Sequence, residues 1–71
     1  MRAKIELVTL GDVKSFVAIV TKIKEPVYLV GNDFKVSAKS LLGVTYSMEW
    51  DEIWCECEKD IYNKIKQYVV D

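Results

Sequence analysis

The chain has 71 residues and a net charge of −1, and 51% of its residues are hydrophobic while 30% are charged. This composition is typical of one small globular domain, and no apolar run approaches the ~20 residues that span a bilayer. The near-neutral charge offers no general attraction to nucleic acid or to an anionic membrane. The first residues also lack the apolar core of a signal peptide. We therefore expect a single cytoplasmic domain over residues 1–71, with neither nucleic acid nor membrane as a partner.

The N-terminal third changes from the period of a strand to the period of a helix. Residues 2–9 alternate, which predicts a half-buried strand. Its inward positions are Ala3, Ile5 and Leu7. From Asp12, which we expect at or close to the N-cap, apolar residues recur at helical spacing. They are Phe16, Ile19, Val20 and Ile23. The helix must end by Glu25, because Pro26 disfavours the helical conformation of the residue before it.

The middle of the chain predicts a β-hairpin followed by a short helix. Residues 26–30 and 34–38 favour strands, and the intervening Gly31-Asn32-Asp33 is a strong turn signal. Ser40 then stands at the N-cap position of a helix that reaches Tyr46 or Ser47. The apolar residues just inside this helix are Leu41, Leu42 and Val44.

The C-terminal third predicts one more strand and one more helix. Trp50 is expected to cover an end of the core. Residues 52–58 alternate, with Cys55 and Cys57 on the inward face beside Ile53. Cys-x-Cys spacing on a strand does not favour a disulfide, and two thiols without histidine are too few for a zinc site. We expect two buried thiols and no metal or cofactor. Residues 60–70 show a final helical face, formed by Ile61, Ile65, Tyr68 and Val69.

The resulting order is β-α-β-β-α-β-α, which predicts an α+β open-faced sandwich with a four-stranded antiparallel sheet covered on one face by helices. This order, together with Lys39-Ser40-Leu41-Leu42-Gly43-Val44, resembles the HPr family of bacterial phosphocarrier proteins. The resemblance covers nearly the whole chain and is best from Val27 to Val44. It implies that the last strand lies between the first strand and the hairpin.

The family's phosphocarrier motif, Gly-Leu-His-Ala-Arg-Pro, corresponds here to Leu10-Gly11-Asp12-Val13-Lys14-Ser15. Asp12 or Val13 takes the place of the histidine, depending on the alignment, and Lys14 takes the place of the arginine. The chain contains no histidine, so no imidazole is present to carry a phosphoryl group. Three interpretations of Asp12 remain: an ordinary helix cap, a substitute acceptor, or a fixed anion that imitates the charged state.

The resemblance implies that Ser40 corresponds to a serine that a dedicated kinase phosphorylates in some members. It also implies that Leu41, Leu42 and Thr45 form the patch through which family members bind partners. The alternatives are that Ser40 only caps the helix and that Leu41 or Leu42 belongs to the core. The expected partner is a protein, such as a regulator or a kinase.

The outward positions of the predicted sheet suggest a second surface. Trp54 on the last strand and Tyr28 and Val30 on the hairpin would lie together, forming either a contact patch for a partner or weak homodimer, or a set of cross-strand pairs. The leading hypothesis for function is a non-catalytic regulatory or binding protein related to the sugar phosphotransferase system. The alternatives are a phosphocarrier with a substitute acceptor and a diverged scaffold with an unrelated partner.

Overall fold

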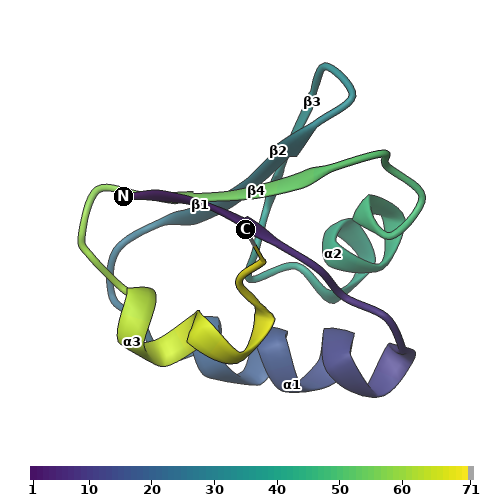
Figure 1. Cartoon of the computed structure of the whole chain (residues 1–71). Coiled ribbons are helices and arrows are strands. Elements are labelled where there is room, and N and C mark those ends of the chain that lie inside the picture. The colour runs from purple at the N-terminus through teal and green to yellow at the C-terminus, as the bar shows by residue number, and fades with distance from the viewer. Residues whose placement is uncertain (71) are drawn as a thin grey trace.

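Four antiparallel strands form a single sheet in the computed structural model, which describes residues 1–70 (Figure 1). The strands are β1 (Arg2–Ile5), β2 (Val27–Gly31), β3 (Phe34–Ser37) and β4 (Ile53–Cys57). Their spatial order is β1-β4-β2-β3. The last strand therefore lies between the first strand and the hairpin, as the resemblance to the HPr family implies.

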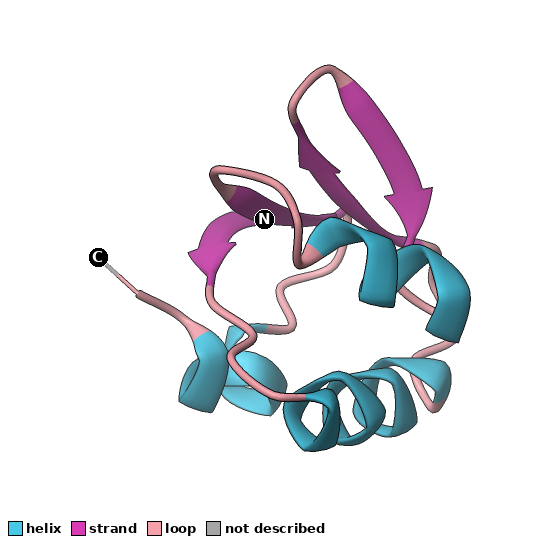
Figure 2. Cartoon of the chain, turned by 90° about the vertical axis from the view of Figure 1, so that its right-hand side faces the viewer, coloured by secondary structure: helices cyan, strands magenta, loops and turns pink. Residues whose placement is uncertain are grey.

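The helices of the described residues all lie on the same side of this sheet (Figures 1 and 2). They are α1 (Leu10–Thr21), α2 (Leu41–Ser47) and α3 (Tyr62–Ile65), and a 3₁₀ turn, η1 (Lys66–Tyr68), follows α3. The predicted α+β arrangement, with a four-stranded antiparallel sheet and helices on one face, is confirmed. The hairpin and the end of α2 at Ser47 also agree with the prediction.

The start of α1 differs from the prediction. Thr9, rather than Asp12, is the N-cap, and the helix begins at Leu10. Asp12 occupies the third helical position and completes a capping box with Thr9. The helix also ends at Thr21, earlier than the limit set by Pro26.

The final helix is shorter than predicted. Only Tyr62–Ile65 is α-helical, and the chain then tightens into η1 and becomes extended. Val69 forms an antiparallel bridge with Ile5, and the Glu6 amide donates to the Tyr68 carbonyl over 2.8 Å. These contacts cover the outer edge of β1, which ends at Ile5 instead of continuing to residue 9.

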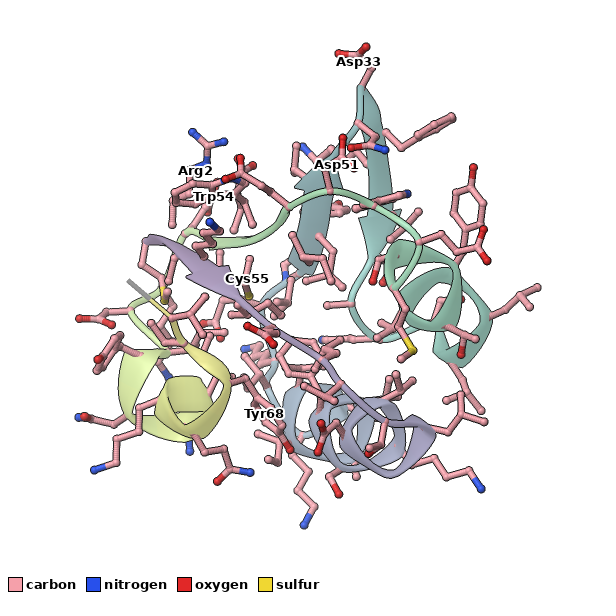
Figure 3. All side chains as sticks on the ribbon, turned by 45° about the vertical axis from the view of Figure 1, so that its right-hand side comes forward. Arg2, Asp33, Asp51, Trp54, Cys55 and Tyr68 are labelled. Atoms are coloured by element: carbon pink, nitrogen blue, oxygen red, sulfur yellow. The ribbon has the colours of Figure 1, made fainter. Side chains whose placement is uncertain are left out.

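The core fills the space between the sheet and the helices. Phe16 of α1 and Leu29 of β2 are fully buried, and Phe16 packs edge-to-face against Tyr68 with ring centroids 5.4 Å apart. Cys55 of β4 is also fully buried. Trp50 is only 8% exposed and belongs to the core. Figure 3 shows Cys55 and Tyr68 on the helix side of the sheet.

The hairpin between β2 and β3 turns through Asn32 and Asp33, with φ angles of 47° and 68°. Positive φ at both central residues is the signature of a type I′ turn, which matches the twist of the two strands. The Asn32 side chain accepts a hydrogen bond from the Asp51 amide over 3.3 Å. The tip of the hairpin is thereby joined to the segment that precedes β4.

Candidate functional site

The N-terminus of α1, where the resemblance places the phosphocarrier site, is closed by its own side chains. The Asp12 amide donates to Thr9 Oγ1 over 3.1 Å. In return, Asp12 Oδ2 accepts from the Val8 amide at 3.0 Å and from the Thr9 amide at 3.2 Å. The carboxylate therefore already supplies the anion that the free N–H groups and positive dipole of a helix N-terminus favour.

The three positions that correspond to the phosphocarrier motif do not form a common site. Asp12 belongs to the cap, Val13 is 1% exposed in the core, and Lys14 is exposed on the helix surface. Across residues 1–70, there is also no cluster of three or more potential metal ligands. Aspartyl phosphorylation generally requires a metal ion to organise the transfer. This geometry favours a structural role for Asp12, as the third-position residue of the Thr9 capping box.

Ser40 is the N-cap of α2, as predicted. Its Oγ accepts a hydrogen bond from the Gly43 amide over 3.1 Å, and its side chain is exposed. The neighbouring Lys39 ammonium donates to the Ile23 carbonyl just beyond the end of α1, where a cation is electrostatically favoured. The start of α2 is therefore joined to the C-terminal end of α1.

The two leucines after Ser40 face away from the core. Leu41 is 49% exposed and Leu42 is 83% exposed, whereas Val44 is fully buried. The alternative assignment of Leu41 or Leu42 to the core is therefore wrong. Thr45 is half-buried, and its hydroxyl donates to the Leu41 carbonyl over 2.7 Å. The sequence-predicted patch residues thus lie on one short, well-capped helix, with both leucines accessible.

Two further exposed apolar residues, Val8 and Leu10, flank the start of α1 and were not predicted. They are 67% and 61% exposed, and α1 packs against α2. The exposure of Val8 could have been predicted, because in the first alternating segment Val8 falls on the same outward side as Lys4 and Glu6. Leu10 likewise falls outside the helical stripe of buried residues.

The open face of the sheet brings Trp54, Tyr28 and Val30 together on adjacent strands. Val30 stands directly opposite Trp54 in the β2–β4 ladder. The Arg2 guanidinium lies 4.6 Å from the centre of a Trp54 ring, and the Lys35 ammonium lies 4.5 Å from the Tyr28 ring. Figure 3 shows Arg2 and Trp54 side by side on this outer surface. The chain therefore covers both aromatic rings with its own cations.

Ion pairs reinforce the same face. Arg2 contacts Glu56 at 3.3 Å, and Lys4 contacts Glu52 at 3.0 Å. The hydrogen bond and charge of Lys4 lower the pKa of Glu52. This geometry agrees with stabilising cross-strand pairs, while a role of Trp54, Tyr28 and Val30 in partner binding stays a prediction.

The cysteines are free and buried, as expected. Burial, together with the neighbouring Cys57, raises the pKa of Cys55 to about 12. The nucleophilic form of cysteine is the thiolate, so Cys55 is poorly suited to nucleophilic chemistry at neutral pH.

Comparisons with known proteins identified no similar protein. No protein-family model, no curated protein and no solved structure matches this chain. Every helix within residues 1–70 is too short or too polar to cross a membrane.

Proposed function

We propose that this chain is a non-catalytic, HPr-like binding protein that engages a protein partner through the N-terminal part of α2. The α2 surface consists of Ser40, Leu41, Leu42 and Thr45. The observation that carries the proposal is the 83% exposure of Leu42, two residues after the N-cap serine Ser40. An apolar side chain on a rigid, anchored helix offers contact area at little entropic cost.

The likeness to the HPr family rests on three features. The strand order β1-β4-β2-β3 and the position of all described helices on one face agree with the family's fold. The third feature is a serine at the N-cap of the second helix. The absence of histidine separates the chain from the phosphocarriers themselves.

Ser40 is the proposed regulatory position on this surface. Its hydroxyl is exposed, and an added phosphate would meet the free N–H groups at the start of α2. Phosphorylation would therefore change the charge of the surface beside Leu42 without requiring α2 to unfold. A kinase, or a regulator that distinguishes the two states, is the partner that suits this arrangement.

Affinity capture from a lysate of the source organism tests the binding function. Immobilised wild type is expected to retain a partner that the double variant Leu41→Ser/Leu42→Ser loses. Tyr62→Ser is the matched control, because Tyr62 is 45% exposed at the start of α3. Capture that is equal for all three proteins would overturn the proposal. Loss with Trp54→Thr alone would move the site to the open face of the sheet.

The alternative of a phosphocarrier with a substitute acceptor has a separate test. The chain is incubated with labelled phosphoenolpyruvate and the upstream enzyme of the phosphotransferase system. We expect no label, because the Asp12 carboxylate is engaged with the Val8 and Thr9 amides. Label on Asp12, located by mass spectrometry, would contradict the non-catalytic assignment.

A further inference from the structure

Three aromatic side chains meet between the hairpin tip and the C-terminal end of α2. Phe34 lies 5.7 Å from Tyr46 and 6.3 Å from Trp50, and Tyr46 lies 6.1 Å from Trp50, measured between ring centroids. Trp50 is buried beneath the other two, whereas Phe34 is 50% and Tyr46 is 47% exposed. The buried tryptophan therefore supports a surface of two accessible aromatic rings.

Exposed acidic residues are adjacent in the chain to residues of this aromatic cluster. Asp33 directly precedes Phe34, and Glu49 and Asp51 flank Trp50; all three acidic residues are exposed. Figure 3 shows Asp33 projecting from the hairpin tip and Asp51 beside the start of β4. The salt bridges of the described residues are Arg2–Glu56 and Lys4–Glu52, so these three carboxylates are not neutralised by an ion pair within residues 1–70.

The open face of the sheet provides an internal contrast. There, Arg2 and Lys35 lie over Trp54 and Tyr28, and so satisfy the attraction of an aromatic face for a cation. At the hairpin tip, no basic side chain of residues 1–70 lies over Phe34 or Tyr46. The aromatic rings and carboxylates there attract the same type of ligand, a planar cation with an apolar stem.

We propose that Phe34, Tyr46, Asp33, Glu49 and Asp51, here named the aromatic–acidic surface, bind an arginine-containing basic segment of a protein partner. The guanidinium stacks on Phe34 or Tyr46, and the neighbouring carboxylates accept its hydrogen bonds. This site goes beyond the function proposed above, because it lies at the other end of α2 and selects for positive charge.

A direct binding assay with a synthetic peptide tests this site without the partner of the α2 surface. The probe is a short fluorescein-labelled peptide that alternates arginine with leucine, followed by fluorescence anisotropy. Its control replaces each arginine with citrulline, which keeps the shape and removes the charge. We expect the arginine peptide to bind, the citrulline peptide to bind at least about tenfold more weakly, and added salt to reduce the difference.

Two matched pairs of substitutions locate the binding. Glu49→Gln/Asp51→Asn should weaken the arginine peptide about three- to tenfold. Glu58→Gln/Asp60→Asn removes the same charge beyond the opposite end of β4 and should leave binding unchanged. Asn at position 60 can still accept the Tyr62 amide hydrogen bond made by Asp60. All four substituted side chains are exposed and lie outside the core, so both variants are expected to fold.

Tyr46→Ser adds a readout of the aromatic contribution and should weaken the arginine peptide about tenfold. The proposal is overturned if the arginine peptide does not bind or if the citrulline peptide binds equally well. Equal effects of the two charge pairs would also overturn it, because they would indicate general electrostatic attraction.

Discussion

At the scale of single residues, Gly31 permits a close approach between the hairpin and the segment that precedes β4. A methyl group on its Cα would overlap the Glu52 carbonyl oxygen and lie 2.8 Å from the Trp50 ring. Gly31→Ala should therefore lower the free energy of unfolding by about 3 kcal/mol. Gly11→Ala is the control, because its added carbon meets only Thr9 Oγ1 at 3.5 Å. It should be neutral or stabilising by up to about 1 kcal/mol. Urea denaturation measures both, and equal stability of the two variants would contradict the close approach.

The cap at Ser40 predicts an asymmetry between two substitutions. Ser40→Ala should destabilise the protein by about 0.5–2 kcal/mol, because the Gly43 amide loses its acceptor. Ser40→Asp should cost little, since a carboxylate also caps and carries the charge that a helix N-terminus favours. Denaturant melts of the three proteins provide the measurement. If Ser40→Ala has the same free energy of unfolding as the wild type, Ser40 does not stabilise the helix start, and the structural basis for tolerating a phosphate there is lost.

At the scale of elements, the burial of Cys55 in β4 predicts a loss of stability at high pH. The folded-state pKa is raised to about 12, whereas an ordinary cysteine has a pKa of about 8.5. Between these values the unfolded chain releases a proton that the folded chain retains, so the unfolding free energy falls as the pH rises. Cys55 alone contributes at most about 1.4 kcal/mol per pH unit there. Below that range it contributes no pH dependence.

The control for this prediction is Cys55→Ala, measured by urea denaturation from pH 7 to pH 11. The variant loses a buried side chain at every pH, but its stability should decline less steeply above about pH 8.5 than that of the wild type. Parallel declines would show that other groups, such as tyrosine and lysine, account for the dependence.

The open sheet face predicts a measurable stabilisation by Trp54. Trp54→Thr removes the stacking with Arg2 and the cross-strand contact with Val30, and should cost about 1–2 kcal/mol. Sedimentation over a wide range of concentrations tests the weak homodimer predicted from the sequence. A dimer that Trp54→Thr abolishes would support that prediction, whereas concentration-independent monomers in both proteins would contradict it.

Local sequence signals predicted most elements, because strand alternation, the Gly31-Asn32-Asp33 turn and the Ser40 cap are all encoded over a few residues. The sequence also contains the capping box of α1, as Thr9 followed three residues later by Asp12. The helical period alone placed Asp12, instead of Thr9, at the N-cap. The early end of the final helix had no local signal. It depends on tertiary contact, since Val69 pairs with Ile5 from the other end of the chain.

At the scale of the whole molecule, the four-stranded antiparallel sheet and its single helical layer were predictable from the order of the elements. Sequence periodicity could not determine that Leu41 and Leu42 are exposed, because both fit an apolar stripe on a short helix. The aromatic–acidic surface was also not predictable, because Phe34 of β3, Tyr46 of α2 and Trp50 of the segment between α2 and β4 meet only in the folded chain. Tertiary packing therefore supplies the information on accessible surface that local patterns lack.

The most direct test of the proposed binding function is photo-crosslinking in the source organism. A photoreactive amino acid is placed, in separate experiments, in place of Leu42 on α2, Tyr28 on the open face, and Tyr62 at the start of α3. If α2 binds a protein partner, a discrete adduct should form from position 42 and from neither of the other two. An adduct from position 28 or 62 with none from position 42 would contradict the account.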